Sequence, residues 1–191
     1  MTSILKVDTL QDASGTGTPY IKGAVLQTVV HQEEGATRFT ASGTNDELLI
    51  ASNAADSTSH LSLSITPKSV NSKILLTARV FHEMSVTANH TTLWSFYRDS
   101  TKLAAPIEGS RRSGIAQTAM GYRDADADST ADTVSYNYYD SPNTTSAITY
   151  IVSFNHTTSN VILNLNRTQT DGNSSGHERG ISILIAQEIG G

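Results

Sequence analysis

The sequence has no cysteine, little charge and no long hydrophobic run. The absence of cysteine from its 191 residues excludes disulfide bonds, thiolate zinc sites and cysteine nucleophiles. Lysine and arginine number 13 against 18 acidic residues, and Arg111-Arg112 is the single adjacent basic pair. A protein that follows a phosphate backbone needs a basic face, so we expect no nucleic-acid partner. No apolar stretch approaches the roughly 20 residues that cross a bilayer, so we expect no membrane insertion.

A positioned set of catalytic groups is also missing. Serine is abundant, but no G-x-S-x-G turn occurs. The acid pair Glu33-Glu34 falls in a predicted loop, where nothing would raise the pKa of one member. The six histidines are scattered and form no HxH or HExxH pair. We therefore predict that the chain is not an enzyme and carries no cofactor.

One acidic segment offers only a weak candidate for a metal site. Asp124, Asp126 and Asp128 stand at alternate positions, and alternate carboxylates can wrap a hard cation such as Ca²⁺. An EF-hand loop needs Gly at its sixth position and Glu at its twelfth, which Ser129 and Ser135 occupy here. We therefore interpret the segment as a solvated acidic loop and predict no metal site.

What the sequence does contain is apolar alternation with a period of two. Leu61, Leu63 and Ile65 share one face of a segment that Pro67 ends. Abundant Ser, Thr and Asn favour strands with hydroxylated outer faces over helices. About eight to ten short strands separated by Asn, Asp, Gly and Ser turns predict an all-β, antiparallel β-sandwich. The other strand segments are Ile74–Val80, Trp94–Phe96, Val134–Tyr138, Ile148–Phe154, Val161–Leu165 and Ile181–Ile185, with weaker ones near Gly23–His31 and Glu47–Ala51.

The chain divides into a short arm and one domain. Residues 1–22 are predicted to form an arm and linker, and residues 23–191 a β-sandwich head. Ala104–Thr133 is the longest weakly patterned stretch, and binding residues on a β scaffold usually lie in such loops. Predicted binding loops are His31–Asp46, Glu108–Asp132 and Asp171–Glu178, and the candidate receptor contacts within them are Arg111, Arg112, Tyr122 and Arg123.

Bulky side chains also occur where a simple sandwich would be polar. Leu75 and Phe81 oppose the face that carries Ile74, Leu76 and Val80, so a second subunit, sheet or loop must cover them. Aromatic residues at strand spacing are predicted to lie in the core or a subunit interface, and Tyr97 and Tyr139, which are out of phase, at exposed or interfacial positions. The core or interface set is Trp94, Phe96, Tyr136, Tyr138, Tyr150 and Phe154.

Several short segments resemble tail-fibre and virion structural proteins of tailed bacteriophages, especially marine phages and cyanophages. The opening Ser3–Asp12, SILKVDTLQD, precedes a glycine-containing segment here as it does in those proteins. The body resembles the distal domain of the same family. The opening motif joins this domain directly, without a long shaft, which indicates a short fibre or a decoration on the particle. The matching pieces are Gly23–Val29, Leu63–Pro67, Ser72–Leu75, Tyr97–Thr101, Asp140–Ser146, Tyr150, Asn166-Arg167 and Glu188–Gly191.

The resemblance implies a jelly-roll-like homotrimer head, similar in shape to tumour-necrosis-factor-like trimers. Such a subunit is made in the cytoplasm of the bacterial host and ends up in the virion. Its arm would attach to other tail or capsid proteins, and its distal loops would meet a host cell-surface glycan or outer-membrane protein. Two alternatives stay open: a capsid-decorating or tail-cementing protein without host contact, and a lectin-like carbohydrate-binding module. The virion-attachment candidates are Ile4, Leu5, Lys6, Val7, Asp8 and Leu10.

Overall fold

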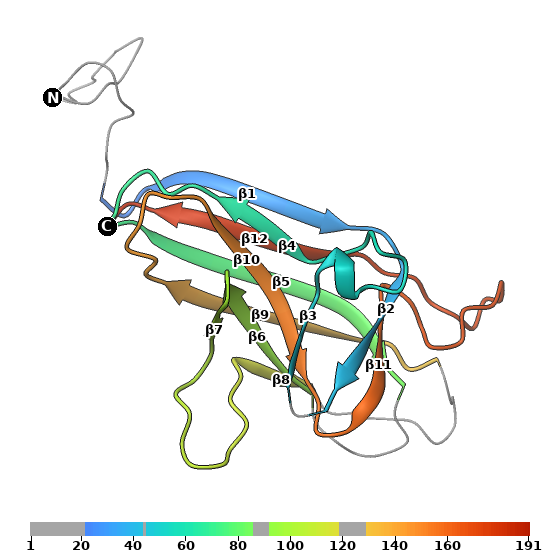
Figure 1. The fold of residues 1–191 in the computed structure, drawn as a ribbon. Coiled ribbons are helices and arrows are strands. Elements are labelled where there is room, and N and C mark those ends of the chain that lie inside the picture. Colours follow the sequence, from blue (N-terminus) through green and yellow to red (C-terminus); the bar gives the residue numbers. More distant parts are fainter. Residues whose placement is uncertain (1–21, 44, 86–91, 119–128) are drawn as a thin grey trace, which may run out of the picture.

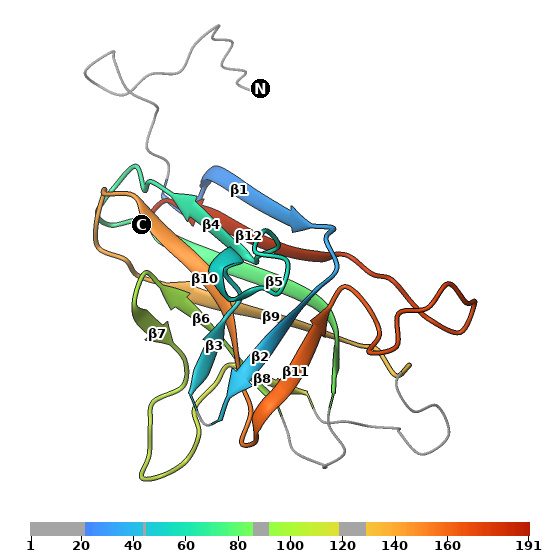
Figure 2. The same cartoon turned by 45° about the vertical axis from the view of Figure 1, so that its right-hand side comes forward.

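The structure, a computed structural model, describes residues 22–43, 45–85, 92–118 and 129–191. These ranges form two antiparallel sheets packed face to face, so the predicted all-β sandwich is confirmed (Figures 1 and 2). No helix within them has the length and apolar character needed to cross a membrane. The elements are β1 (Val25–Glu33), β2 (Thr37–Ser42), β3 (Asp46–Leu48), the 3-10 helix η1 (Ala51–Asn53), β4 (Ser62–Ile65), β5 (Lys73–Met84), β6 (Thr92–Arg98), β7 (Thr101–Leu103), β8 (Ala116–Thr118), β9 (Asp132–Asp140), β10 (Ile148–Asn155), β11 (Ser159–Leu165) and β12 (Ser182–Ile189).

Several of these strands lie end to end and act as one. In the first sheet, β9 runs along one edge of β5, while β12 and β11 follow each other along its other edge. β1 and β2 continue the same arrangement outside β12 and β11. In the second sheet, β4 and β3 share the outer edge of β10, and β7 and β8 share the outer edge of β6. Each sheet is therefore four strands wide.

The order of these combined strands is that of a jelly roll. Numbered along the chain, the eight combined strands lie in the order 1-8-3-6 in the first sheet and 2-7-4-5 in the second. The two sheets interleave in this way when a long hairpin of antiparallel strands is folded over twice, which is the double Greek key. The jelly-roll-like topology implied by the resemblance thus follows from the strand pairing of this chain itself.

Three combined strands are interrupted by an insertion that leaves and rejoins the sheet at adjacent points. The insertions are residues 50–60 between β3 and β4, 104–115 between β7 and β8, and 167–181 between β11 and β12. The first carries η1, and the other two form the long loops at the lower left and right of Figure 1. The hydrogen bonds that close them run from Leu61 N to Leu49 O (2.8 Å), from Ala105 N to Gly114 O (3.4 Å) and from Gly180 N to Asn166 O (3.2 Å).

The core lies between the two sheets and is built from the predicted alternating residues. Four members of the predicted aromatic set are fully buried, Tyr136 is buried beside them, and Tyr138 packs against this core. The four are Trp94, Phe96, Tyr150 and Phe154. The ring of His82 meets Trp94 edge-on, with ring centroids 4.7 Å apart. Burial lowers the pKa of His82, so this histidine is held in its neutral form.

One expectation about an individual segment was wrong. The predicted loop His31–Asp46 consists mostly of the end of β1 and of β2, whose Phe39 and Ala41 are buried in the core. Two apolar residues among polar ones gave too weak an alternation to predict β2. In β12 the core side belongs to Leu184 and Ala186, so the isoleucines of that segment lie on the opposite face.

Both ends of the described domain lie at one end of the sandwich. Gly23 N donates to Gly190 O at 2.7 Å, and Gly190 N donates to Ala24 O at 2.9 Å, beside the points where Figure 1 places the start of β1 and the C-terminus. β9 begins beside His82, at the far end of β5 from these residues. Nine residues of β5 separate the two ends, or roughly 30 Å.

Candidate functional site

Two surfaces and one part-buried junction stand out. The first surface is the outer face, which we define as the solvent side of β1, β12, β5 and β9. Its centre is the row in which Val30 pairs with Ile185 and Ile185 with Thr77. Val30 is 53% exposed and Tyr139, at the β9 edge, is 56% exposed. This face is more apolar than a solvated sheet requires. Its apolar members are Val30, Leu75, Phe81, Tyr139, Ile181, Ile183 and Ile185.

Among the described residues, the chain covers one end of the outer face. Phe81 is half-buried under Gly180, at the end of the 167–181 insertion, and the backbone N–H of Phe81 is bonded to the hydroxyl of Ser182 (3.0 Å). No loop in the described ranges covers Leu75 or Ile185 in this way, and both side chains are half-exposed there. The sequence predicted that a subunit, sheet or loop covers Leu75 and Phe81. In the described residues a loop covers Phe81, and Leu75 is not covered.

β9 adds an unpaired strand edge to this face. Over the described residues it pairs with β5 alone, along its full length from Asp132 to Asp140. A long edge strand invites pairing with another chain, and proteins usually shorten, charge or cover it. Tyr139 stands on the outer face at this edge, as predicted for an exposed or interfacial position.

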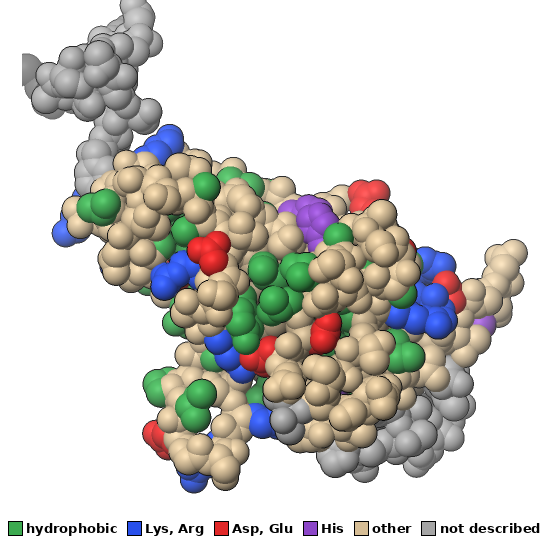
Figure 3. Space-filling model, in the orientation of Figure 1, with side chains coloured by type: hydrophobic (Ala, Val, Ile, Leu, Met, Phe, Trp, Pro, Cys, Tyr) green, Lys and Arg blue, Asp and Glu red, His purple; other side chains and the backbone are tan. Residues whose placement is uncertain are grey.

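The second surface is the loop pocket, a cavity of about 310 Å³ between the 104–115 insertion and the start of β6. Leu93, Pro106 and Ile115 supply its apolar wall, and Arg111 and Arg112 its positive charge. In Figure 3 the insertion is the lobe at the lower left, where blue, red and green side chains stand out from a largely tan surface. Pockets that bind small ligands are typically 300–1,000 Å³, with an apolar wall and a few polar groups.

The two arginines of the loop pocket are held differently. Arg112 is half-buried and donates from Nη1 to Asn155 Oδ1 at 3.2 Å, which ties the loop to the end of β10. Arg111 donates from Nη1 to the backbone oxygen of Glu108 at 3.3 Å and lies 3.9 Å from its carboxylate. The side chains of this pair are 77% and 81% exposed, so water weakens their attraction.

Sequence reasoning thus placed two of its four candidate receptor contacts on one pocket. The other two, and the acidic segment, lie outside the described residues, as does the predicted attachment arm. No group of three or more His, Asp or Glu side chains in the described ranges could hold a metal ion. The residues outside are Tyr122, Arg123, Asp124, Asp126 and Asp128, and Ile4, Leu5, Lys6, Val7, Asp8 and Leu10.

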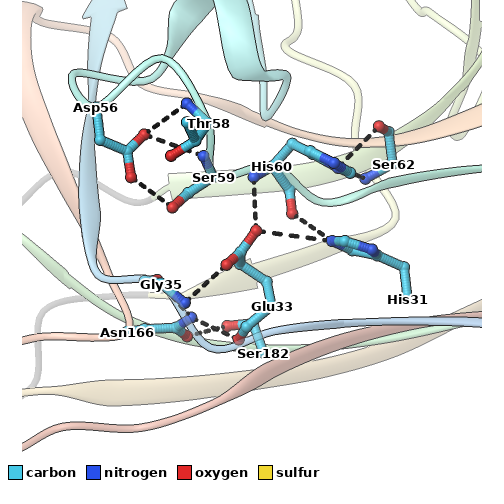
Figure 4. Close-up of polar contacts among 10 residues, drawn as sticks. All are labelled: His31, Glu33, Gly35, Asp56, Thr58, Ser59, His60, Ser62, Asn166 and Ser182. Atoms are coloured by element: carbon cyan, nitrogen blue, oxygen red, sulfur yellow. Dashed lines mark hydrogen bonds and ion pairs between the residues drawn. The ribbon is translucent and has the colours of Figure 1, made fainter.

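Sequence reasoning missed a part-buried junction around Glu33 (Figure 4). Its carboxylate accepts the backbone N–H groups of Gly35 (2.7 Å) and His60 (2.8 Å), which joins the β1–β2 turn to the first insertion. His31 stacks on His60 with ring centroids 4.3 Å apart and donates from Nε2 to the oxygen of His60 at 2.9 Å. Burial lowers the pKa of His60, and the neighbouring His31 lowers it further. Glu33, one member of the acid pair Glu33-Glu34, therefore stabilises the fold by accepting backbone hydrogen bonds.

Other buried acids have the same role. Glu83 accepts the N–H of Gln169 at 2.7 Å and of Thr130 at 3.2 Å, which fixes the last insertion and the segment before β9. Glu188, which is fully buried, accepts the N–H of Lys68 at 2.7 Å. A backbone N–H bonded to a carboxylate is stronger than a neutral pair. These acids stabilise the chain where it leaves the sheets.

Comparisons with known proteins give distant likenesses in fold. No protein-family model matches the chain. No curated protein matches it. Solved structures similar to it include one of infectious bursal disease virus, Gx strain (12% identity, TM-score 0.36, covering 86% of this chain), and a subviral particle of that virus's VP2 (12%, 0.35, 97%). A viral particle of the same virus is 12% identical, with a TM-score of 0.37, over 97% of this chain. This chain spans only 37% to 42% of the length of those chains, and likenesses at these TM-scores do not bear on function.

Proposed function

We propose that this chain is a virion structural protein of a tailed bacteriophage, namely the head of a short tail fibre that works as a homotrimer. The observation that carries the proposal is the outer face. A chain with only 37% hydrophobic residues places Val30, Leu75, Ile183 and Ile185 on the solvent side of one sheet. Large exposed apolar patches on soluble proteins mark interaction sites. Copies of the same chain are the occupant that this face fits best.

The mixed composition of the outer face supports a subunit interface. Thr77, Arg79 and Gln187 are interspersed with its apolar residues. Interfaces between protein chains are only moderately more apolar than other surface, and a polar rim is usual. Each copy would bury its apolar centre against a neighbour, and the unpaired edge of β9 would lie beside that contact.

The placement of the chain ends supports a fibre head. The described domain begins and ends at one end of the sandwich, and β9 begins at the other. An arm that precedes Gly23 enters at the first end, where attachment to other virion proteins leaves the opposite loops free to face a host. The resemblance of the opening SILKVDTLQD to phage tail-fibre proteins supports the same orientation, with the arm toward the virion and the opposite loops toward the host. No described group of side chains suggests catalysis, and the proposed role is binding and assembly.

The oligomeric state is the first test. Light scattering on the purified full chain is expected to give about three times the chain mass of 20.4 kDa. Val30→Glu places a charge in the central row of the outer face, opposite Ile185, and is expected to give monomers that keep the β-sheet circular dichroism. Val70→Glu is the matched control, because Val70 is 52% exposed in the loop between β4 and β5, outside the four strands that form this face. A folded monomer for the unmodified chain would contradict the proposed trimer.

Host contact is tested separately. Fluorescently labelled protein is expected to adsorb to cells of the bacterial host, and an excess of unlabelled protein is expected to compete with it. A trimer that adsorbs to no host cell would instead support the capsid-decorating or tail-cementing alternative. A monomer that adsorbs would support the lectin-like alternative.

A further inference from the structure

The loop pocket combines two features that a single class of ligand would satisfy. Among the described residues that line it, Arg111 and Arg112 are cationic and Glu108 is anionic, although the whole chain carries a formal net charge of −5. Its other side, with Leu93 and Ile115, is apolar. A ligand that fits must carry a negative group on one side and non-polar C–H groups on the other.

We infer that the loop pocket binds a sugar that bears a carboxylate, such as a uronic acid in a cell-surface glycan. A pyranose ring presents one face of C–H groups, which can pack on Leu93 and Ile115. Its carboxylate would meet the guanidinium groups, whose planar N–H pairs match a carboxylate in geometry. A cavity of about 310 Å³ accommodates one such ring.

The two arginines would have different roles in binding the carboxylate. Arg112 is fixed by its bond to Asn155, at the end of β10, so its guanidinium is held in place before a ligand arrives. Arg111 is paired only with the exposed Glu108, and an exposed ion pair is weak enough to be exchanged for a ligand carboxylate. Glu108 would then be available to accept sugar hydroxyl groups.

The insertion is anchored well enough to keep this arrangement. Ile115 N donates to Trp94 O at 2.7 Å, and Ser113 Oγ donates to Ala105 O across the neck of the loop. Gly114 fits closely at this neck: a Cβ there would lie 3.1 Å from the backbone oxygen of Trp94, and the neighbouring chain would have to shift by a few tenths of an ångström. The pocket therefore sits on the edge of a sheet and not on a free loop.

This inference rests on the proposed function, because it names the class of receptor that the host-facing loops would recognise. One site of this size is expected to bind a monosaccharide weakly, with Kd about 1 mM, or about −4 kcal/mol. Three copies in a trimer, and several trimers on a particle, would raise the attachment strength through multivalent contact.

The test is ligand-observed NMR titration of the full chain with D-glucuronate at low salt. D-glucose, which has the ring without the charge, and acetate, which has the charge without the ring, are expected to bind at least about tenfold more weakly. Arg112→Gln and Arg111→Gln are each expected to weaken glucuronate binding by about tenfold. Arg179→Gln is the matched control, since Arg179 lies in another insertion and pairs with Asp171 there.

Equal binding of glucuronate and glucose, or binding unchanged in both arginine variants, would overturn the inference. The variant at Arg111, an exposed side chain, guards against loss of binding through misfolding at the half-buried Arg112. Light scattering and host-cell adsorption of the same preparation separate the two proposals. A trimer that adsorbs to host cells but does not bind glucuronate would support the proposed fibre-head function. The same result would contradict the inference that the loop pocket binds an acidic sugar.

Discussion

Replacing Glu33 by alanine removes the acceptor that joins the end of β1 to the first insertion. The carboxylate accepts two backbone N–H groups, from Gly35 and His60, and its side chain is only 13% exposed. Without it, both donors stay in a largely enclosed site without a partner. A buried donor left unsatisfied costs about 1–3 kcal/mol.

The expected loss in the free energy of unfolding is about 2–4 kcal/mol, taking the lower part of that range for each donor because water reaches the remaining 13%. For a domain of this size, each kcal/mol lowers Tm by about 2–4 °C. Glu33→Gln keeps one acceptor oxygen but not the charge, so it is expected to lose about half as much. Glu34→Ala is the control, because Glu34 is exposed and accepts only from the Gln32 side chain.

Urea unfolding at one fixed protein concentration measures these differences. Trp94 is the only tryptophan in the chain and is fully buried, so its fluorescence reports on the core without interference. A fixed concentration is needed because association would itself add stability. If Glu33→Ala changes the free energy of unfolding no more than Glu34→Ala does, the junction is not a stabilising element and the reasoning fails.

Two further predictions follow from buried groups. Burial lowers the pKa values of His60 and His82 below 6.5, so below that pH the unfolded chain takes up protons that the folded chain does not. Stability is expected to be level above pH 6.5 and to fall below it by at most about 1.4 kcal/mol per pH unit for each group, and a urea midpoint that stays constant from pH 8 to pH 5.5 would contradict this. Gly180→Ala would push a methyl group into the ring of Phe81 and is expected to cost about 1–3 kcal/mol, as measured by thermal unfolding. Gly176→Ala meets only ordinary contacts and should be close to neutral, so equal effects at the two glycines would refute the packing argument.

The sequence predicted those parts of the fold in which one residue in two is large and apolar. β5 and β10 were found because large apolar residues recur at every second position over a long run, such as Ile74 and Leu76 in β5 and Tyr150 and Phe154 in β10. β2 was missed because Phe39 is its one large apolar residue. The need for a cover over Leu75 was also predicted, since a side chain opposite a known core face has only the outer face left.

The candidate site was predictable only in part. Arg111 and Arg112 were singled out as a charged pair in a weakly patterned segment, and both line the loop pocket. Leu93 and Ile115 could not be assigned to the same cavity, because their meeting depends on how the 104–115 insertion crosses the start of β6. Glu33 gave no signal, since its partners are backbone N–H groups from segments far apart in the chain.

The interrupted strands have a consequence for how this scaffold can change. Because the 104–115 insertion leaves and returns at residues already bonded to each other, Ala105 and Gly114, its length is independent of the sheets on either side. Doubling the length of such a loop adds only about 0.6 kcal/mol of closure cost. The segment could therefore be exchanged: grafting a different sequence between Leu103 and Ala116 would alter the loop pocket while the core and the outer face stay as they are.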